Sequence, residues 1–191
     1  MTSEQHKQVI DLYLDHIKEY MTQSGGLFPH ITVFADEKDK KVEDDETVHK
    51  AIIHIPIPSE YMKSDDDKDV FIDEIMPAIF KTLVEKFTPY GIAWASEAWM
   101  RVADADKFNP KKDNYKNIPI KKEVLFISVE TDLISETLIY DIERTGKQVC
   151  ADGDLVDSIN LKEIEEFRTP DKVEGRFAGL YKKLKNYVKV D

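Results

Sequence analysis

Cysteine is almost absent from this sequence, which has a single one, Cys150, among 191 residues. One cysteine excludes an internal disulfide and zinc sites built from several thiolates, and it is typical of a reducing compartment. No apolar run approaches the ~20 residues that a membrane-spanning helix needs. The N-terminal stretch lacks a basic start followed by an apolar block. We therefore expect no signal peptide, no membrane insertion and a cytoplasmic location.

Basic residues are also fewer than acidic ones. The chain contains 27 Lys and Arg residues and 38 Asp and Glu residues, for a formal net charge of −11. Binding of nucleic acid through its phosphates needs a basic surface, so nucleic acid is an unlikely partner. The acidity is concentrated in two stretches, 36–46 and 62–68, which we expect to be solvated loops. If they formed an ordered double row, the protein would be an acidic inhibitor that mimics DNA.

The common catalytic and cofactor-binding motifs are missing as well. The chain contains no G-x-x-x-x-G-K-[ST], G-x-G-x-x-G, G-x-S-x-G, H-E-x-x-H or C-x-x-C. The aspartates that begin at Asp65 do not form an EF-hand calcium loop, because Val70 occupies the position that requires Gly and Met76 the position that requires Glu. The sequence therefore predicts no cofactor and no metal site.

The hydrophobic pattern predicts one α+β domain over residues 1–191. Hydrophobic residues make up 41% of the chain, enough for a sizeable core. Apolar positions at 3–4 residue spacing predict helices, and alternation predicts strands. The expected helices are 4–22, 68–87 (kinked or split by Pro77) and 176–188, and the expected strands are 28–35, 47–57, 91–102, 122–130, 136–143, 148–151 and 155–161. Short links between strands favour an antiparallel β-sheet with two or three helices mainly on one face, leaving the other face partly exposed.

One short string on the first strand has catalytic potential. His30-Ile31-Thr32 resembles the H-x-[ST] element of two-histidine phosphoesterases, in which one histidine acts as base and a second as acid. The second histidine here would be His54, which is followed by Pro56 rather than by a hydroxyl residue. The alternative is that His30 is a strand histidine with a structural hydrogen-bond partner.

A second candidate is a polar strip across three predicted strands. On each predicted strand these polar residues occupy alternate positions, so their side chains point to the same side of the strand. If the strands are neighbours, the polar side chains would lie together on one face of the sheet. The strip would consist of Glu97, Trp99, Arg101, Asp141 and Glu143. Paired carboxylates beside Arg and Trp suit the binding of a partner or a ligand, and a solvated face with cross-strand charge pairs is the alternative.

The segment 96–147 resembles uncharacterised proteins of phage and bacterial genomes. The resemblance rests on Ser96-Glu97-Ala98-Trp99, on Lys122-Glu123-Val124 and on Gly175-Arg176-Phe177. It implies a phage origin and a small accessory role, and it assigns no functional residue.

These observations favour a non-enzymatic accessory protein that binds a protein partner, or a second copy of itself, through an open sheet face. A small phosphoesterase centred on His30 and His54 is one alternative, and the DNA-mimicking inhibitor is another.

Overall fold

The computed structural model describes residues 2–38, 50–101, 109, 112, 114, 117–164, 169–170 and 178–188. The helical elements are α1 (Ser3–Ser24), η1 (Ser59–Met62), α2 (Asp65–Val70), the π-helical η2 (Phe71–Ile75), α3 (Met76–Lys86) and α4 (Leu180–Val188). The strands are β1 (His30–Glu37), β2 (Lys50–Pro56), β3 (Phe87–Arg101), β4 (Ile120–Thr131), β5 (Ser135–Val149), β6 (Leu155–Glu163) and β7 (Thr169–Pro170).

The strands form one antiparallel sheet in the order β2-β1-β3-β4-β5-β6, with β7 paired to β5 off this path. Every pairing is antiparallel. The predicted α+β class is confirmed. β2 and β6 are the two ends of the main path, so the β1–β2 pair forms one margin of the sheet and the β5–β6 pair the other.

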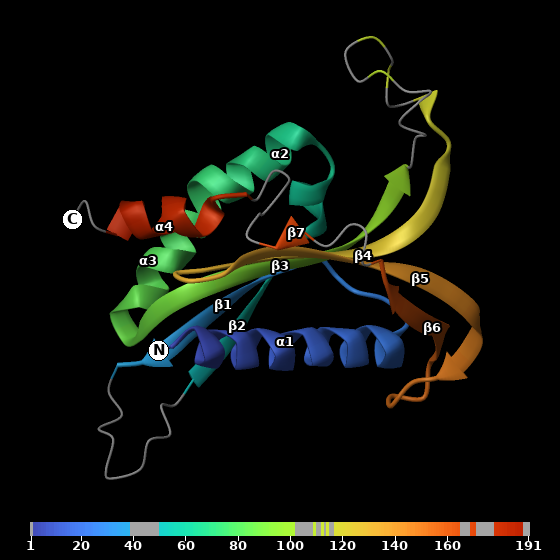
Figure 1. Cartoon of the computed structure of the whole chain (residues 1–191), viewed down its shortest axis with the longest axis horizontal. Helices are drawn as coiled ribbons and strands as arrows, with labels where there is room; N and C mark the ends of the chain where they lie inside the picture. Colours follow the sequence, from blue (N-terminus) through green and yellow to red (C-terminus); the bar gives the residue numbers. More distant parts are fainter. Residues whose placement is uncertain are drawn as a thin grey trace.

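Helices lie on both faces of this sheet (Figure 1). Three of them, α2, α3 and α4, cover one face, where a buried cluster includes Ile31, Ile92 and Leu184. The fourth, α1, covers the opposite face over a second cluster that includes Tyr13 and Leu125. Three helices on one face agree with the prediction, and α1 also packs on the second face, because its apolar stripe needs a sheet face of its own.

Helix α1 matches its predicted span and is capped at both ends. Thr2 and Gln5 form a capping box, in which each side chain bonds the backbone N–H of the other residue. Gly25 ends the helix with φ +72°, a left-handed conformation that favours glycine. The curled β5–β6 margin passes close to this end of α1 (Figure 1).

The second predicted helix is divided as its proline indicated. α2 and α3 are joined by the π-helical segment η2, directly ahead of Pro77 in the first turn of α3. Proline has no N–H to donate, and its ring clashes with the turn before it. The wider turn of a π-helix relieves that clash. The acidic stretch 62–68 is not a loop, because from Asp65 onward it forms α2, with the Ser64 hydroxyl accepting a bond from the Asp67 N–H. In the stretch 36–46, residues 39–46 lie outside the described residues.

The β5–β6 hairpin differs from its prediction. β5 continues unbroken to Val149, where two strands were expected, and it passes Thr145 as a bulge between Arg144 and Gly146. Its connection to β6 spans residues 150–154, with Gly153 at φ +88°. The C-terminal helix α4 docks on the core through Leu180, Tyr181 and Leu184, as its apolar stripe indicated.

Candidate functional site

A pocket of about 340 Å³ lies between α1 and the β1–β2 margin of the sheet. We call it the histidine pocket. Three imidazoles contribute to its wall, and all of its other lining residues are apolar or aromatic. Its lining residues are His16, Ile17, Tyr20, Leu27, Phe28, His30, His54 and Pro56.

The three imidazoles of the histidine pocket are packed against one another. The ring centroids of His30 and His54 lie 5.4 Å apart in an edge-to-face arrangement. Those of His16 and His54 lie 5.6 Å apart and are nearly parallel. Within the described part of the chain, no three His, Cys, Asp or Glu side chains are placed to hold a metal ion together. The cluster therefore presents hydrogen-bonding imidazoles rather than a preformed metal cage.

Buried polar groups support the cluster from behind. His30 Nδ1 lies 3.0 Å from the Phe28 carbonyl oxygen, and its Nε2 lies 3.5 Å from the Tyr13 hydroxyl. His54 Nδ1 lies 2.9 Å from the hydroxyl of Thr32, whose side chain is fully buried. The register explains this last contact, because Thr32 and His54 are direct partners across β1 and β2.

Burial and mutual repulsion act together on these imidazoles. Burial is the main cause that lowers the pKa of His30 below its ordinary value, with the charge of His16 acting in the same direction. Burial also lowers the pKa of His54, and the charges of His30 and His16 lower it further. Both rings are therefore neutral at neutral pH.

The structure brings the predicted trio of His30, Thr32 and His54 together on the α1 face. It gives these residues unequal access to solvent, since His30 exposes 7% of its surface and Thr32 none, whereas His54 is the most accessible of the three. His16 is the residue that the sequence did not indicate. It joins the site only because α1 packs across β1 and β2, a tertiary contact that no local pattern encodes.

The predicted polar strip is divided between the two faces of the sheet. Glu97 lies opposite Leu125 on β4, and Leu125 lies opposite Tyr140 on β5, which places Glu97 on the α1 face. Asp141 lies opposite Val124 on β4. Val124 is the residue next to Leu125, so Val124 and Asp141 are both on the other face. The expectation of a single cluster is wrong, because the β4–β5 register offsets the two sets by one residue.

Asp141 and Glu143 line a hollow of about 490 Å³ on that other face, together with Lys122 and Lys162. The Asp141 carboxylate is 2.8 Å from the Lys122 ammonium, a cross-strand charge pair. Arg101 is exposed and donates from its guanidinium to the Ile118 carbonyl.

On the α1 face, Glu97 belongs to an ion cluster built around Arg144. The guanidinium donates to Glu97, to both carboxylate oxygens of Glu123 and to Asp157, at 2.7 to 3.0 Å. It also donates to the Gly25 carbonyl at 2.9 Å. Burial raises the pKa of Glu97, whereas hydrogen bonds from Arg144 lower that of Glu123. Arg144 is thus a clamp that joins three strands to the end of α1.

A sequence signal for this clamp exists. Arg144 alternates in phase with Leu138, Tyr140 and Ile142, all of which are buried on the α1 face. A charged residue in phase with an apolar row indicates a partner on the same face. Trp99, in contrast, exposes 65% of its surface opposite Glu123 on β4.

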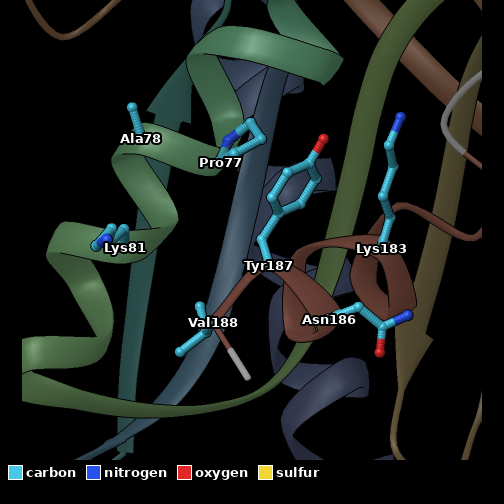
Figure 2. A pocket seen from close by; sticks show the side chains of 7 residues that line it. All are labelled: Pro77, Ala78, Lys81, Lys183, Asn186, Tyr187 and Val188. Atoms are coloured by element: carbon cyan, nitrogen blue, oxygen red, sulfur yellow. The ribbon is translucent and has the colours of Figure 1, made fainter. Parts of the chain in front are cut away.

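A larger hollow of about 610 Å³ separates α3 from α4 (Figure 2). Tyr187 extends from α4 toward Pro77 of α3, and Lys81 and Lys183 stand at its margins (Figure 2). Lys183 is already paired with Asp73. Asn186 and Tyr187 supply further polar groups to the lining of this hollow.

Among the described helices, none is both long and apolar enough to span a lipid bilayer. Comparison of the chain with models of protein families, with curated proteins and with solved structures finds no match. The resemblance around Ser96–Trp99 stays a prediction, and functional conclusions rest on the geometry of the sites.

Proposed function

We propose that the protein binds a small organic anion, consisting of an apolar body and one phosphate or carboxylate group, in the histidine pocket. The packing of three imidazoles around one pocket with otherwise apolar and aromatic walls carries this proposal. Imidazoles bind oxyanions through N–H donors and through charge once they are protonated. The walls formed by Leu27, Phe28 and Pro56 would receive the apolar body.

Proton uptake should accompany binding. The lowered pKa values of His30 and His54 leave the pocket uncharged at neutral pH. An anion placed beside these rings stabilises the imidazolium form and offsets the repulsion between neighbouring imidazoles. Affinity for the anion should therefore rise as the pH falls from 8 to 6. The net charge of −11 opposes anion approach at long range, and salt screens that repulsion.

Calorimetric titration with phenyl phosphate tests this proposal. We expect saturable binding that is stronger at pH 6 than at pH 8 and that falls at least about tenfold in the His54→Gln variant, the loss expected when one charge-assisted hydrogen bond is removed. His6 is the matched control, because it lies toward the other end of α1 and contacts Thr131. Equal losses in His6→Gln and His54→Gln, or affinity that rises with pH, would contradict the proposal.

Hydrolysis of a phosphoester remains an alternative for the same pocket, because both histidines of the predicted pair line it. The arrangement favours His16 and His54 as the working pair, since His30 and Thr32 are buried. Turnover of bis(p-nitrophenyl) phosphate that is lost in both His16→Gln and His54→Gln, with His6→Gln unaffected, would support it. Binding of phenyl phosphate without turnover would leave the protein a binding module.

A second candidate function is partner binding at Trp99, as the sequence led us to expect. The observation in its favour is the 65% exposure of this large aromatic side chain at the end of β3. We expect Trp99→Ala to abolish a specific pull-down, or self-association in sedimentation, while stability changes by less than about 0.5 kcal/mol. Leu133→Ala, at another exposed apolar position, is the control. A large loss of stability in Trp99→Ala would mean that Trp99 is structural.

A further inference from the structure

Strand β2 ends the sheet beside the histidine pocket, and among the described residues no strand pairs with its outer edge. The middle of the strand, residues 51–55, has the sequence Ala-Ile-Ile-His-Ile and contains no Asp, Glu, Lys or Arg. The edge strands of natural sheets commonly carry charged residues or proline, which prevent pairing with another chain. In β2 such residues stand only at the two ends, as Lys50 and Pro56.

The strand at the opposite end of the sheet differs in this respect. β6 carries Asp157 and Lys162 within its span, and the Asp157 carboxylate is paired with Arg144. In β2 the corresponding middle position is occupied by Ile52, an apolar side chain that exposes 40% of its surface. Of the two margins, β2 is therefore the one suited to pair with a further strand.

The hydrogen bonds to β1 show which backbone groups of β2 are directed outward. The Ile57 N–H donates to the Pro29 carbonyl at 2.9 Å, in register with the pairing of β1 and β2. In an antiparallel pair, positions that exchange hydrogen bonds alternate with positions whose N–H and C=O point away from the neighbouring strand. The odd-numbered residues of β2 therefore bond to β1. The backbone groups of the even-numbered residues point outward, and these residues are Lys50, Ile52, His54 and Pro56.

We infer that β2 pairs antiparallel with β2 of a second copy of this chain, about a two-fold axis at Ile53, so that two sheets join into one continuous sheet. This register uses the whole strand. It places Ile52 opposite His54 of the other copy, and Lys50 opposite Pro56 of the other copy. Each outward N–H then meets an outward carbonyl, and Pro56, which has no N–H, acts only as an acceptor.

A second copy fits this edge because the edge is complementary to itself. A two-fold axis repeats the same donors and acceptors in the opposite direction, and this is the symmetry of most dimers. On the α1 face, the exposed Ile52 would be covered by the His54 ring of the other copy. On the opposite face, the two Ile53 side chains would meet beside the buried cluster that each already contacts. The interface does not depend on the binding of an anion in the histidine pocket.

Hydrogen exchange of the backbone amides tests the pairing in the unmodified protein. At about 0.15 M salt, repulsion between two copies of net charge −11 is screened beyond ~8 Å. The amides of Ile53 and Ile55, which bond to β1, should be protected at every protein concentration. Those of Ile52 and His54 should gain at least about tenfold protection as the concentration rises into the millimolar range, because only pairing between copies protects them. Rapid exchange of both amides at the highest concentration would overturn the inference.

Proline at position 52 provides a selective disruption. Ile52→Pro removes an N–H that points away from β1, so the fold of the single chain does not use it. In sedimentation velocity we expect a dimer for the wild type and for the matched control Ile52→Val, and a monomer for Ile52→Pro at the same concentration. If Ile52→Pro does not fold, Ile52→Lys keeps the N–H and places a charge in the middle of the edge, with the same loss expected.

The same measurement separates this interface from the exposed surface around Trp99, because Trp99→Ala should remain dimeric. A monomeric wild type, or a dimer that persists in Ile52→Pro and Ile52→Lys, would overturn the inference. So would a dimer that is lost in Trp99→Ala.

The register is tested by single cysteines in a Cys150→Ser background. Ile53→Cys should form a disulfide between copies on mild oxidation, because opposed residues at a position without backbone hydrogen bonds have Cα atoms about 4.5 Å apart, within the range for a disulfide. Ala51→Cys is the matched control, since it would lie opposite Ile55 of the other copy and should remain reduced. Crosslinking of Ala51→Cys in preference to Ile53→Cys would contradict an axis at Ile53.

Discussion

Arg144 distributes its guanidinium donors among three carboxylates and one carbonyl, drawn from β3, β4, β6 and the residue that ends α1. Glu97 uses its second carboxylate oxygen to accept the Leu27 N–H at 2.6 Å. Removal of one partner from a half-buried ion cluster costs more than the cluster contributes as a whole, because the remaining carboxylates are left desolvated and close together.

Replacement of Arg144 should therefore destabilise the protein. We expect Arg144→Met, which keeps most of the aliphatic stem, to lower the free energy of unfolding by roughly 1–3 kcal/mol in urea denaturation. Arg101→Met is the matched control, because Arg101 is exposed, and it should cost less than about 0.5 kcal/mol. Similar values for the two variants would show that the clamp contributes little.

At the scale of elements, the junction between α1 and the β5–β6 margin depends on close backbone approach. A Cβ on Gly25 would lie 2.6 Å from the Asp157 backbone nitrogen and 2.7 Å from the Val156 Cβ. The residue also adopts φ +72°. Glycine is required here for both reasons, and neither neighbour is the flexible end of a long side chain.

Comparison of substitutions at Gly25 and Gly153 separates the two requirements, because Gly153 also has a positive φ, +88°, but a Cβ added there would meet nothing within 4 Å. Gly153→Ala should cost only the backbone strain, about 1 kcal/mol. Gly25→Ala adds a steric clash, so its free energy of unfolding should fall by at least about 1–3 kcal/mol more. Thermal denaturation of the two variants measures the difference, and equal losses would contradict the close packing at Gly25.

Most elements could be predicted from local pattern, because periodicity and capping act within a few residues. The span of α1, the division at Pro77 and the β4 strand follow from apolar spacing and from proline chemistry. The length of β5 could not be predicted in this way. Gly146 is a residue type that often ends a strand, and here the strand continues through it because Gly146 pairs with Ser158 on β6.

The candidate site was predicted only in part, for a related reason. His30, Thr32 and His54 share a strand pair, so alternation places them together. His16 lies in the histidine pocket because α1 packs against the β1–β2 margin. Asp141 lies on the opposite face from Glu97 because the β4–β5 register is offset by one residue from the one that the predicted strip requires. Both depend on contacts between elements, which the pattern within any one element does not specify.

At the scale of the whole molecule, the histidine pocket links stability to pH. The pKa values of His30 and His54 are lowered in the folded protein below the ordinary value of 6.5, to which unfolding returns them. Near and below pH 6.5 the unfolded chain therefore binds more protons than the folded protein does. Stability from these groups is fully present above pH 6.5 and is lost as the pH falls toward the folded-state values.

Thermal denaturation between pH 7.5 and 5.5 measures this linkage, in a range above most carboxylate titration. We expect the melting temperature of the wild type to fall across the range, and that of His54→Gln to fall less steeply. His6→Gln serves again as the matched control and should keep the wild-type slope. A melting temperature that rises on acidification would reverse the sign required by the lowered pKa values.

The central claim is that the clustered imidazoles form one binding site for an organic anion, and proton NMR of the histidine rings tests it most directly. During titration with phenyl phosphate at pH 6.5, the resonances of His16 and His54 should shift and saturate with a single dissociation constant, while those of His6 remain in place. Resonances that do not move, or that drift linearly and equally at all histidines including His6, would contradict the assignment of this pocket.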